Sequence, residues 1–307
     1  MNATKSDTPF FHLFAQHGWA DGNKDMVILA NRLTRNKHPY SAPDLGYVPT
    51  WLRIEPLIQR VEAIAIQTAA AYPHRPWRIV GHSMGGLIWL EVLHRHPEWW
   101  SRVHSLVLVA SPVGGADLGR LLDPLGWGIG IATDLGTNRR AMAESIAARI
   151  PTLVIAGDID GGRDGTIPVM STFVSHARFV CLPDIDHARL KTHPEVVRLI
   201  HQFWRDDSVG AAIAPDFVIQ QVRAIPGITD SHPRNLEQAR IWHTFEDGRT
   251  LRLWKNDFGI HYVYLVSTRD VCLYAGFVGW LHTLELWKVL VLLKQGDRPF
   301  GAAPTVD

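Results

Sequence analysis

One short segment constrains the fold of this chain more than any other. The short, mostly apolar run 77–80 is followed by residues 81–85, which read Gly-His-Ser-Met-Gly, and then by an apolar stretch with helical spacing. In a G-x-S-x-G turn between a strand and a helix, the serine backbone is strained and the glycines avoid collisions with both elements. The hydroxyl then projects from the carboxyl edge of a parallel sheet, where a helix N-terminus stabilises a developing anion. The pattern makes Ser83 a candidate nucleophile; the alternative is an ordinary strand-to-helix loop.

Length and charge limit the class of protein. At 307 residues the chain can bury a large core, as one large domain or two smaller ones. Its 31 Lys plus Arg residues nearly balance its 30 Asp plus Glu residues, which argues against a nucleic acid or an anionic membrane surface as a partner. No uninterrupted apolar stretch reaches the roughly 18 to 20 residues needed to span a bilayer.

The first residues and the cysteines predict the compartment. Residues 1–9 are polar and lack the basic and long apolar regions of a signal peptide, so we expect a cytoplasmic protein. The only cysteines, Cys181 and Cys272, fit a reducing compartment. We expect both to be buried free thiols.

Strand-like and helix-like segments alternate over residues 10–205, which is typical of a mostly parallel sheet covered by helices on both faces. The pattern predicts strands over residues 10–15, 39–43, 77–82, 104–110, 151–156 and 178–182. It predicts helices over residues 24–33, 51–71, 85–96 and 194–204. We therefore expect residues 1–205 to form one α/β domain.

Residues 113–150 break this alternation. They are rich in Gly and Leu, show no clear strand, and carry Trp127 among four glycines. Their position at the ligand-facing edge of the expected sheet predicts a short cap, with Trp127 as a candidate substrate-binding residue. The alternative is an irregular surface connection.

The last hundred residues have a different pattern. Residues 206–215 are expected to be a linker, and residues 216–307 a small α+β unit without a catalytic motif. Strands are predicted over residues 240–245, 249–254, 261–266 and 271–278, the first two as a hairpin. The helix predicted over residues 281–294 is apolar nearly all round, so it either packs within the chain or pairs two copies of the chain.

A nucleophilic serine needs a base and an acid, which follow in this type of fold as Asp or Glu and then His. Three aspartates, Asp158, Asp160 and Asp164, follow the strand predicted over residues 151–156. We favour Asp164, because the Asp-Gly-Thr-Ile-Pro segment that it begins is expected to open a helix that holds the carboxylate. Asp160 is the second choice, and any of the three could instead be a turn residue.

His187 is the candidate base among 16 histidines, because it lies in the loop after the last predicted strand. A neutral imidazole can take the serine proton and return it to the leaving group. His193 instead resembles a residue at the start of a helix. His94 and His96 lie at a helix end without recognisable partners for a metal site, so we predict no metal.

Acyl transfer also requires two backbone N–H donors for the oxyanion. One is expected at Met84, directly after the nucleophile, and the other in the loop after the first strand, at Trp19. His17 and Gly18 are expected to shape that turn and to lie near the substrate. The alternative for this segment is a surface loop.

Taken together, these segments resemble an α/β-hydrolase, and more narrowly the small lipases and esterases that include bacterial triacylglycerol lipases and GPI-inositol deacylase-like proteins. The resemblance covers residues 10–205, and its motifs are the oxyanion loop 17–19, the elbow 81–86, the turn 110–115 and the acid loop 164–169. It implies an α/β-hydrolase fold that hydrolyses carboxylic esters with a Ser-His-Asp triad and no cofactor.

Two departures from this family concern the ends of the domain. The first predicted strand leads directly to His17, so the usual two N-terminal strands are missing, as in the minimal members. Residues 216–307 have no counterpart in those lipases. This difference concerns the identity of the substrate and not the type of reaction.

The resulting hypothesis is a serine esterase with a small apolar ester as substrate. His187 deprotonates Ser83, Trp19 and Met84 hold the oxyanion, and Asp164 orients His187. The same residues would serve a thioesterase, an acyltransferase or a cofactor-free haloperoxidase, since one scaffold carries many chemistries. The alternative from another class is a catalytically silent binding or scaffold protein.

Overall fold

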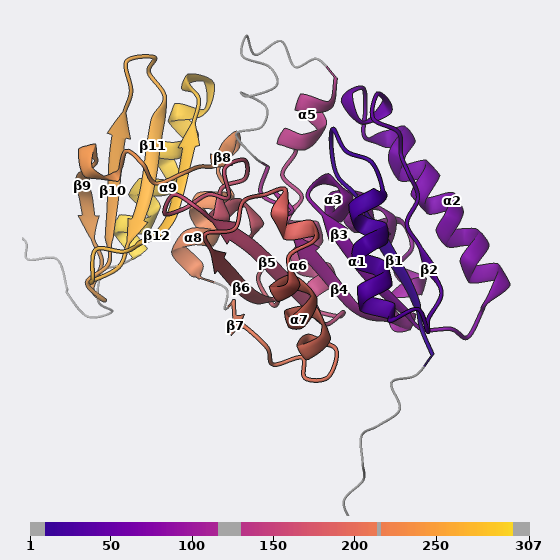
Figure 1. The fold of residues 1–307 in the computed structure, drawn as a ribbon. Coiled ribbons are helices and arrows are strands. Elements are labelled where there is room, and N and C mark those ends of the chain that lie inside the picture. The colour runs from indigo at the N-terminus through magenta and orange to yellow at the C-terminus, as the bar shows by residue number, and fades with distance from the viewer. Residues whose placement is uncertain (1–9, 116–129, 214–215, 297–307) are drawn as a thin grey trace, which may run out of the picture. The chain divides into compact units, whose positions relative to one another are not determined.

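The computed structural model describes residues 10–115, 130–213 and 216–296. The chain divides into two compact units, with the boundary between residues 214 and 215. Each unit has its own sheet and is described separately (Figure 1).

The first unit contains a seven-stranded sheet in the order β2-β1-β3-β4-β5-β6-β7. Its strands are β1 (His12–Gln16), β2 (Tyr40–Ser41), β3 (Trp77–His82), β4 (Val103–Val109), β5 (Thr152–Asp158), β6 (Arg178–Pro183) and β7 (Ala211–Ala212). Only β7 runs antiparallel to its neighbour, β6. The helices are α1 (Lys24–Thr34), α2 (Glu55–Ala71), α3 (Met84–Arg95), α5 (Ile131–Gly136), α6 (Arg140–Ala147) and α7 (Pro194–Phe203).

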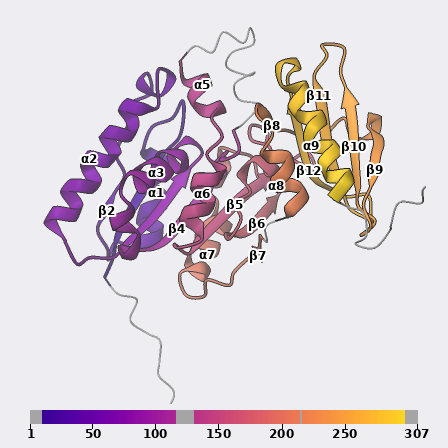
Figure 2. The same ribbon diagram turned by 180° about the vertical axis from the view of Figure 1, so that it is seen from behind.

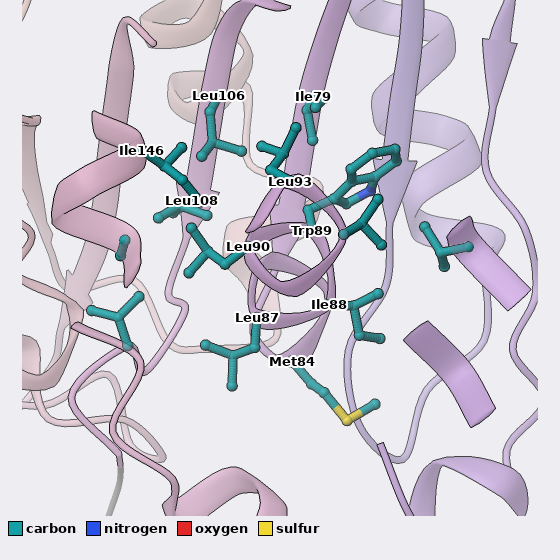
Figure 3. Close-up of a cluster of buried hydrophobic side chains, with 14 of the residues drawn as sticks. Ile79, Met84, Leu87, Ile88, Trp89, Leu90, Leu93, Leu106, Leu108 and Ile146 are labelled. Atoms are coloured by element: carbon teal, nitrogen blue, oxygen red, sulfur yellow. The ribbon is translucent and has the colours of Figure 1, made fainter. Parts of the chain in front are cut away.

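Successive strand residues face two different cores, because side chains alternate across a sheet. On β4, Leu106 and Leu108 join the core that α2, α3 and α6 cover, whereas Val107 and Val109 join the core that α1 and α7 cover. Figure 3 shows the side chains of α3 filling the space between the sheet and Ile146 of α6. The predicted parallel sheet with helices on both faces is therefore present.

Several elements differ from the sequence prediction. The segment expected to be a cap contains α5 and α6 within its described part, and α6 packs beside α3 as part of the layer that covers the sheet. Residues 116–129, with Trp127, lie outside the described residues. The expected linker contributes β7 to the edge of the main sheet. The long helix predicted from residue 51 begins at Glu55, after a 3-10 turn over Pro49–Trp51.

The second unit is a five-stranded antiparallel sheet in the order β8-β12-β11-β10-β9 with two helices. Its elements are α8 (Phe217–Arg223), β8 (Ile228–Asp230), β9 (Arg240–Thr244), β10 (Thr250–Lys255), β11 (His261–Val266), β12 (Cys272–Val278) and α9 (Thr283–Gly296). Figure 2 shows α9 lying along one face of this sheet. The sequence prediction missed α8 and β8, which are short and have no clear hydrophobic period.

Burial on α9 follows one face of the helix. Leu286, Leu290 and Leu293 are buried, whereas Leu284 and Leu292 are largely exposed. No helix in the described part of the chain is both long and apolar enough to cross a membrane. Cys181 lies on β6 with an exposed side chain and Cys272 is only partly buried, so the expectation of two buried thiols is wrong.

Candidate active site

Ser83 occupies a strained turn between β3 and α3. Its φ and ψ angles are 54° and −126°, outside the region that most L-residues adopt. A Cβ at Gly81 would lie closer than 3.0 Å to Gly86, and one at Gly85 would lie equally close to the backbone of Gln16. The turn is therefore possible only with glycine on both sides of the serine, as the motif predicted.

Asp164 and His187 form the central hydrogen bond of the site. The Nδ1 atom of His187 lies 2.7 Å from Oδ2 of Asp164, whose side chain is almost fully buried. The other carboxylate oxygen accepts the backbone N–H groups of Thr166 and Ile167 at 2.9 and 2.6 Å. The N–H of His187 also donates to the Asp164 carbonyl oxygen at 2.9 Å. The carboxylate is thus fixed from two sides.

This support differs from the helix start that the sequence suggested. The segment after Asp164 is a tight turn in which the Asp164 N–H donates to the Ile167 carbonyl oxygen. The helix that follows is a single 3-10 turn over Val169–Thr172. Because the carboxylate accepts N–H groups two and three residues ahead, the turn replaces the helix as its anchor.

The other two aspartates of this loop have local partners. Oδ1 of Asp158 accepts the N–H groups of Gly161 and Gly162 at 2.7 and 2.8 Å and shapes the turn. The Asp160 carboxylate lies 2.9 Å from the guanidinium of Arg163. Asp164 is the member of the three that the structure brings to His187.

His187 and the serine lie close together without a direct hydrogen bond. The imidazole ring of His82, the residue before Ser83, lies 4.6 Å from the ring of His187. No hydrogen bond links Ser83 Oγ to His187 in the described part of the chain. Contacts between a base and its nucleophile are often loose before substrate binds.

His82 is a site residue that the sequence reasoning missed. Its Nε2 donates to the backbone carbonyl oxygen of His187 at 3.0 Å, so it positions the loop that carries the base. Burial lowers the pKa of His82 far below its ordinary value, and the neighbouring His187 lowers it further, which keeps the ring neutral. Its place directly before the serine is the only signal that the sequence offers.

The loop after β1 lies against the serine turn. A Cβ at Gly18 would lie 2.8 Å from the Ser83 Cβ and 3.2 Å from the Met84 nitrogen. The backbone N–H groups of Trp19 and Met84 donate to no acceptor among the residues that the structure describes. Two unused N–H donors therefore lie in the two segments that meet beside the hydroxyl of Ser83.

His17 fixes that loop through both ring nitrogens. Its Nδ1 donates to the Gly18 carbonyl oxygen at 3.0 Å, and its Nε2 accepts the Leu45 N–H at 2.9 Å. Burial lowers the pKa of His17, which agrees with a neutral ring in this tautomer. Since both nitrogens are used within the chain, His17 positions the loop rather than contacting a substrate.

Lys191 is a second positioning residue that the sequence reasoning missed. Its buried ammonium lies 2.7 Å from Asp21 and 3.1 Å from Asp25, near the start of α1. Burial lowers the pKa of Lys191, but the two carboxylates outweigh burial, so the net shift is upward. This ion pair ties the loop after His187 to the loop after β1.

Aromatic and apolar side chains surround the loop that carries Trp19. The rings of Trp19 and Trp51 meet edge to face at 4.4 Å, and Tyr47 lies 6.1 Å from Trp51. Tyr47, Trp51 and Leu52 have exposed side chains although they are apolar. The sequence analysis placed Trp51 in a helix and did not assign it to the site.

The remaining histidine candidates have structural roles. His96 bridges Glu62 and Glu98 on the surface, and His193 caps α7 by accepting the Glu195 N–H. Across the described ranges, no group of three or more His, Cys, Asp or Glu side chains could hold a metal ion.

Comparison with known proteins supports the fold. No family model and no curated protein match the sequence. The structure is similar to a lipase of Bacillus licheniformis in its mature form, at 14% identity and a TM-score of 0.52, over 66% of this chain and 96% of that one. A serine hydrolase from Cycloclasticus zankles is 16% identical with a TM-score of 0.46, over 66% and 92% of the two chains. The first unit has an α/β-hydrolase fold, as predicted, and the second unit adds an antiparallel sheet.

Proposed function

We propose that this protein is a serine hydrolase that cleaves carboxylic esters through an acyl-enzyme intermediate. The observation that carries the proposal is the 2.7 Å hydrogen bond between Asp164 and His187 beside the strained turn of Ser83. A buried carboxylate that holds an imidazole next to a serine hydroxyl is the arrangement that activates the hydroxyl as a nucleophile.

In the proposed reaction, Nε2 of His187 takes the proton of Ser83 while Oγ attacks the ester carbonyl carbon. The tetrahedral intermediate then collapses, the C–O bond to the alcohol breaks, and His187 returns the proton to the leaving alcohol. Water, deprotonated by His187, attacks the acyl-enzyme and releases the carboxylic acid and the free serine. Asp164 holds the tautomer of His187 in which Nδ1 carries the proton.

The oxyanion is proposed to bind the N–H groups of Trp19 and Met84. Both donors are unused by described residues, and Gly18 brings their segments together. Donors fixed before the reaction stabilise the developing charge without a cost of reorganisation at that moment.

The substrate is proposed to be a small-molecule ester with an apolar acyl or alcohol group. The exposed side chains of Tyr47, Trp51 and Leu52 lie on the segment that contacts Trp19, and exposed apolar side chains on a site's rim are typical of surfaces that bind apolar ligands. The same residues would serve a thioester or acyl transfer to another alcohol. No cofactor takes part in the proposed reaction.

The decisive test compares wild type with Ser83→Ala on p-nitrophenyl esters of short, medium and long acyl chains. We expect hydrolysis by wild type and a loss on the order of 10³-fold or more in the variant. Ser101→Ala, which changes an exposed serine, is the matched control. If wild type cleaves no ester and a fluorophosphonate probe does not label Ser83, the silent scaffold becomes the better account.

We also propose that the C-terminal unit pairs two copies of the chain through α9. Leu284 and Leu292 of this helix are 72% and 64% exposed, which is unusual for leucines on an ordered helix. Light scattering after size exclusion should give twice the chain mass, and Leu284→Glu should reduce it to the mass of one chain. A monomeric wild type would reject this proposal.

A further inference from the structure

Two hollows open at the amino edge of the main sheet, opposite the edge that carries Ser83. Their volumes are about 460 and 420 Å³, and both are lined by Arg78, Trp204 and Arg205. They lie where β3 and β4 begin and where α1 and α7 end. Volumes of this size are sufficient for a small-molecule ligand.

Arg78 is a buried cation without a partner in these hollows. It is the second residue of β3 and only 5% exposed. Its guanidinium makes no hydrogen bond or ion pair with any residue that the structure describes, and its Nε is buried. A buried charge is normally paired, because burying an ion without a partner carries a large desolvation cost.

Two aromatic rings hold the guanidinium in place. The Arg78 Cζ atom lies 4.4 Å from the centroid of Phe11 and 4.3 Å from that of Trp204. Burial lowers the pKa of Arg78 to about 10, so the group stays charged at neutral pH. These cation–π contacts hold the guanidinium against the two rings, which meet edge to face at 5.3 Å, and they use none of its N–H donors.

Further unused donors lie next to it. Ser105 is the register partner of Arg78 on β4, is 3% exposed, and its Oγ has no hydrogen-bond partner. The indole Nε1 of Trp204 is buried and equally unpaired. The side chains of Arg78, Ser105 and Trp204 line the same hollow, so three orphaned polar groups converge on it.

The charges around the hollows are mostly positive. Arg35, Lys37 and Arg205 add exposed cations at the rims. Burial lowers the pKa of His38 and His104, and the charge of Arg78 lowers both further. The acidic groups in the lining are Asp206 and Asp207, both on one hollow and exposed.

We propose that these hollows form a second ligand site that binds a small phosphate-bearing molecule, with Arg78 and Ser105 as its buried donors. Arginine binds phosphate oxygens through two parallel N–H groups, and a serine hydroxyl can donate to a third oxygen. The site is separate from the catalytic centre, because it lies at the opposite ends of the same strands.

Inorganic pyrophosphate is the probe for this site, measured by titration calorimetry at low ionic strength. We expect binding by wild type and a Kd at least tenfold weaker in Arg78→Met, which keeps an unbranched side chain against Phe11 and Trp204 but removes the charge. Arg205→Gln should weaken binding severalfold. Arg60→Met removes the same charge from the exposed face of α2 and should leave the Kd unchanged.

Thermal unfolding without ligand distinguishes a binding residue from a structural one. If Arg78 serves a ligand, Arg78→Met should unfold at the same or a higher temperature than wild type, and pyrophosphate should raise the Tm of wild type alone. A lower Tm of the unliganded variant, with no effect on the Kd, would assign Arg78 a structural role and overturn the proposal.

Two further outcomes would also overturn it. Wild type that binds no pyrophosphate would reject the site, and citrate binding as tightly at equal ionic strength would reject the preference for phosphate. If Arg78→Met fails to fold, Arg205→Gln and Ser105→Ala carry the same test, because unchanged pyrophosphate binding in both would reject the site.

Discussion

The two edges of the main sheet differ in how their buried polar groups are satisfied. At the carboxyl edge, Asp164 accepts three hydrogen bonds, and Lys191 lies between two carboxylates. At the amino edge, Arg78 and Ser105 have no hydrogen-bond or ion-pair partner in the described part of the chain. Polar groups that are paired within the protein hold a site in one geometry before the substrate binds. Buried polar groups without such a pair can instead be satisfied by hydrogen bonds to a ligand.

The variant with the largest expected effect is Asp164→Asn, at the carboxyl edge. The amide oxygen of the new asparagine side chain should keep accepting the N–H groups of Thr166 and Ile167, so its NH₂ group faces His187. The ring must then accept a hydrogen bond at Nδ1 and carry its proton at Nε2, where it cannot take the serine proton. We expect ester hydrolysis to fall on the order of 10³- to 10⁴-fold with little change in stability. Asp160→Asn, in the same loop, is the control and should retain nearly full activity. Equal losses in both would reject Asp164 as the acid.

Gly18→Ala tests the contact between the two oxyanion segments. The added methyl group would lie 2.8 Å from the Ser83 Cβ and must displace the loop that carries Trp19. Loss of one aligned donor typically costs on the order of 10²- to 10³-fold in kcat. The steady-state kcat on the preferred p-nitrophenyl ester measures this, with Gly22→Ala as control, because its added Cβ has no neighbour closer than 3.9 Å. An unchanged kcat would place the oxyanion elsewhere.

Lys191→Met compares the two edges directly. Removing the ammonium leaves the carboxylates of Asp21 and Asp25 without their cation. Because both carboxylates are partly buried, we expect the free energy of unfolding to fall by about 2 kcal/mol. Arg78→Met should show no such loss, since the Arg78 charge has no described ion-pair or hydrogen-bond partner and methionine can keep the contacts with Phe11 and Trp204. Urea unfolding measures both variants, and Lys24→Met, which changes an exposed lysine at the start of α1, is the control. A similar loss in the lysine and arginine variants would remove the distinction between the edges.

The sequence predicted the parts of the site that depend on the succession of neighbouring residues and elements along the chain. The strand, turn and helix around Ser83 and the order Ser, Asp, His follow from residues that are close in sequence or from strand succession. The roles of His82 and Lys191 depend on partners more than a hundred residues away, such as the carbonyl oxygen of His187. Neither a period nor a motif marks such contacts.

The same limit explains the errors in the fold. β7 has two residues and β8 has three, so neither carries a readable alternation, and both are strands only because β6 and β12 offer them an edge. Arg78 likewise lies within a strand that the sequence predicts, over residues 77–82. Its lack of a partner becomes visible only when Phe11, Trp204 and the start of β4 surround it.

The smallest expected effect concerns pH and His12, at the start of β1 on the amino edge. Burial, and then the charge of Arg75, lower the pKa of His12 to about 4 from an ordinary value near 6.5. Above pH 6.5 the ring is neutral in the folded and the unfolded chain, so it has no effect. Below pH 6.5 the unfolded chain binds a proton that the folded chain does not, and stability falls until the pH reaches about 4.

We expect this residue to account for a loss of about 1–2 kcal/mol across that window, less than the full shift implies because the environment relaxes. Urea unfolding of wild type and His12→Asn between pH 7 and pH 4 measures it, and the variant should lose less stability as the pH falls. His74→Asn, which changes an exposed histidine, should follow wild type. If His12→Asn shows the full wild-type slope, the acid sensitivity arises from other histidines whose pKa values burial lowers, such as His17 and His82 at the carboxyl edge or His38 and His104 at the amino edge.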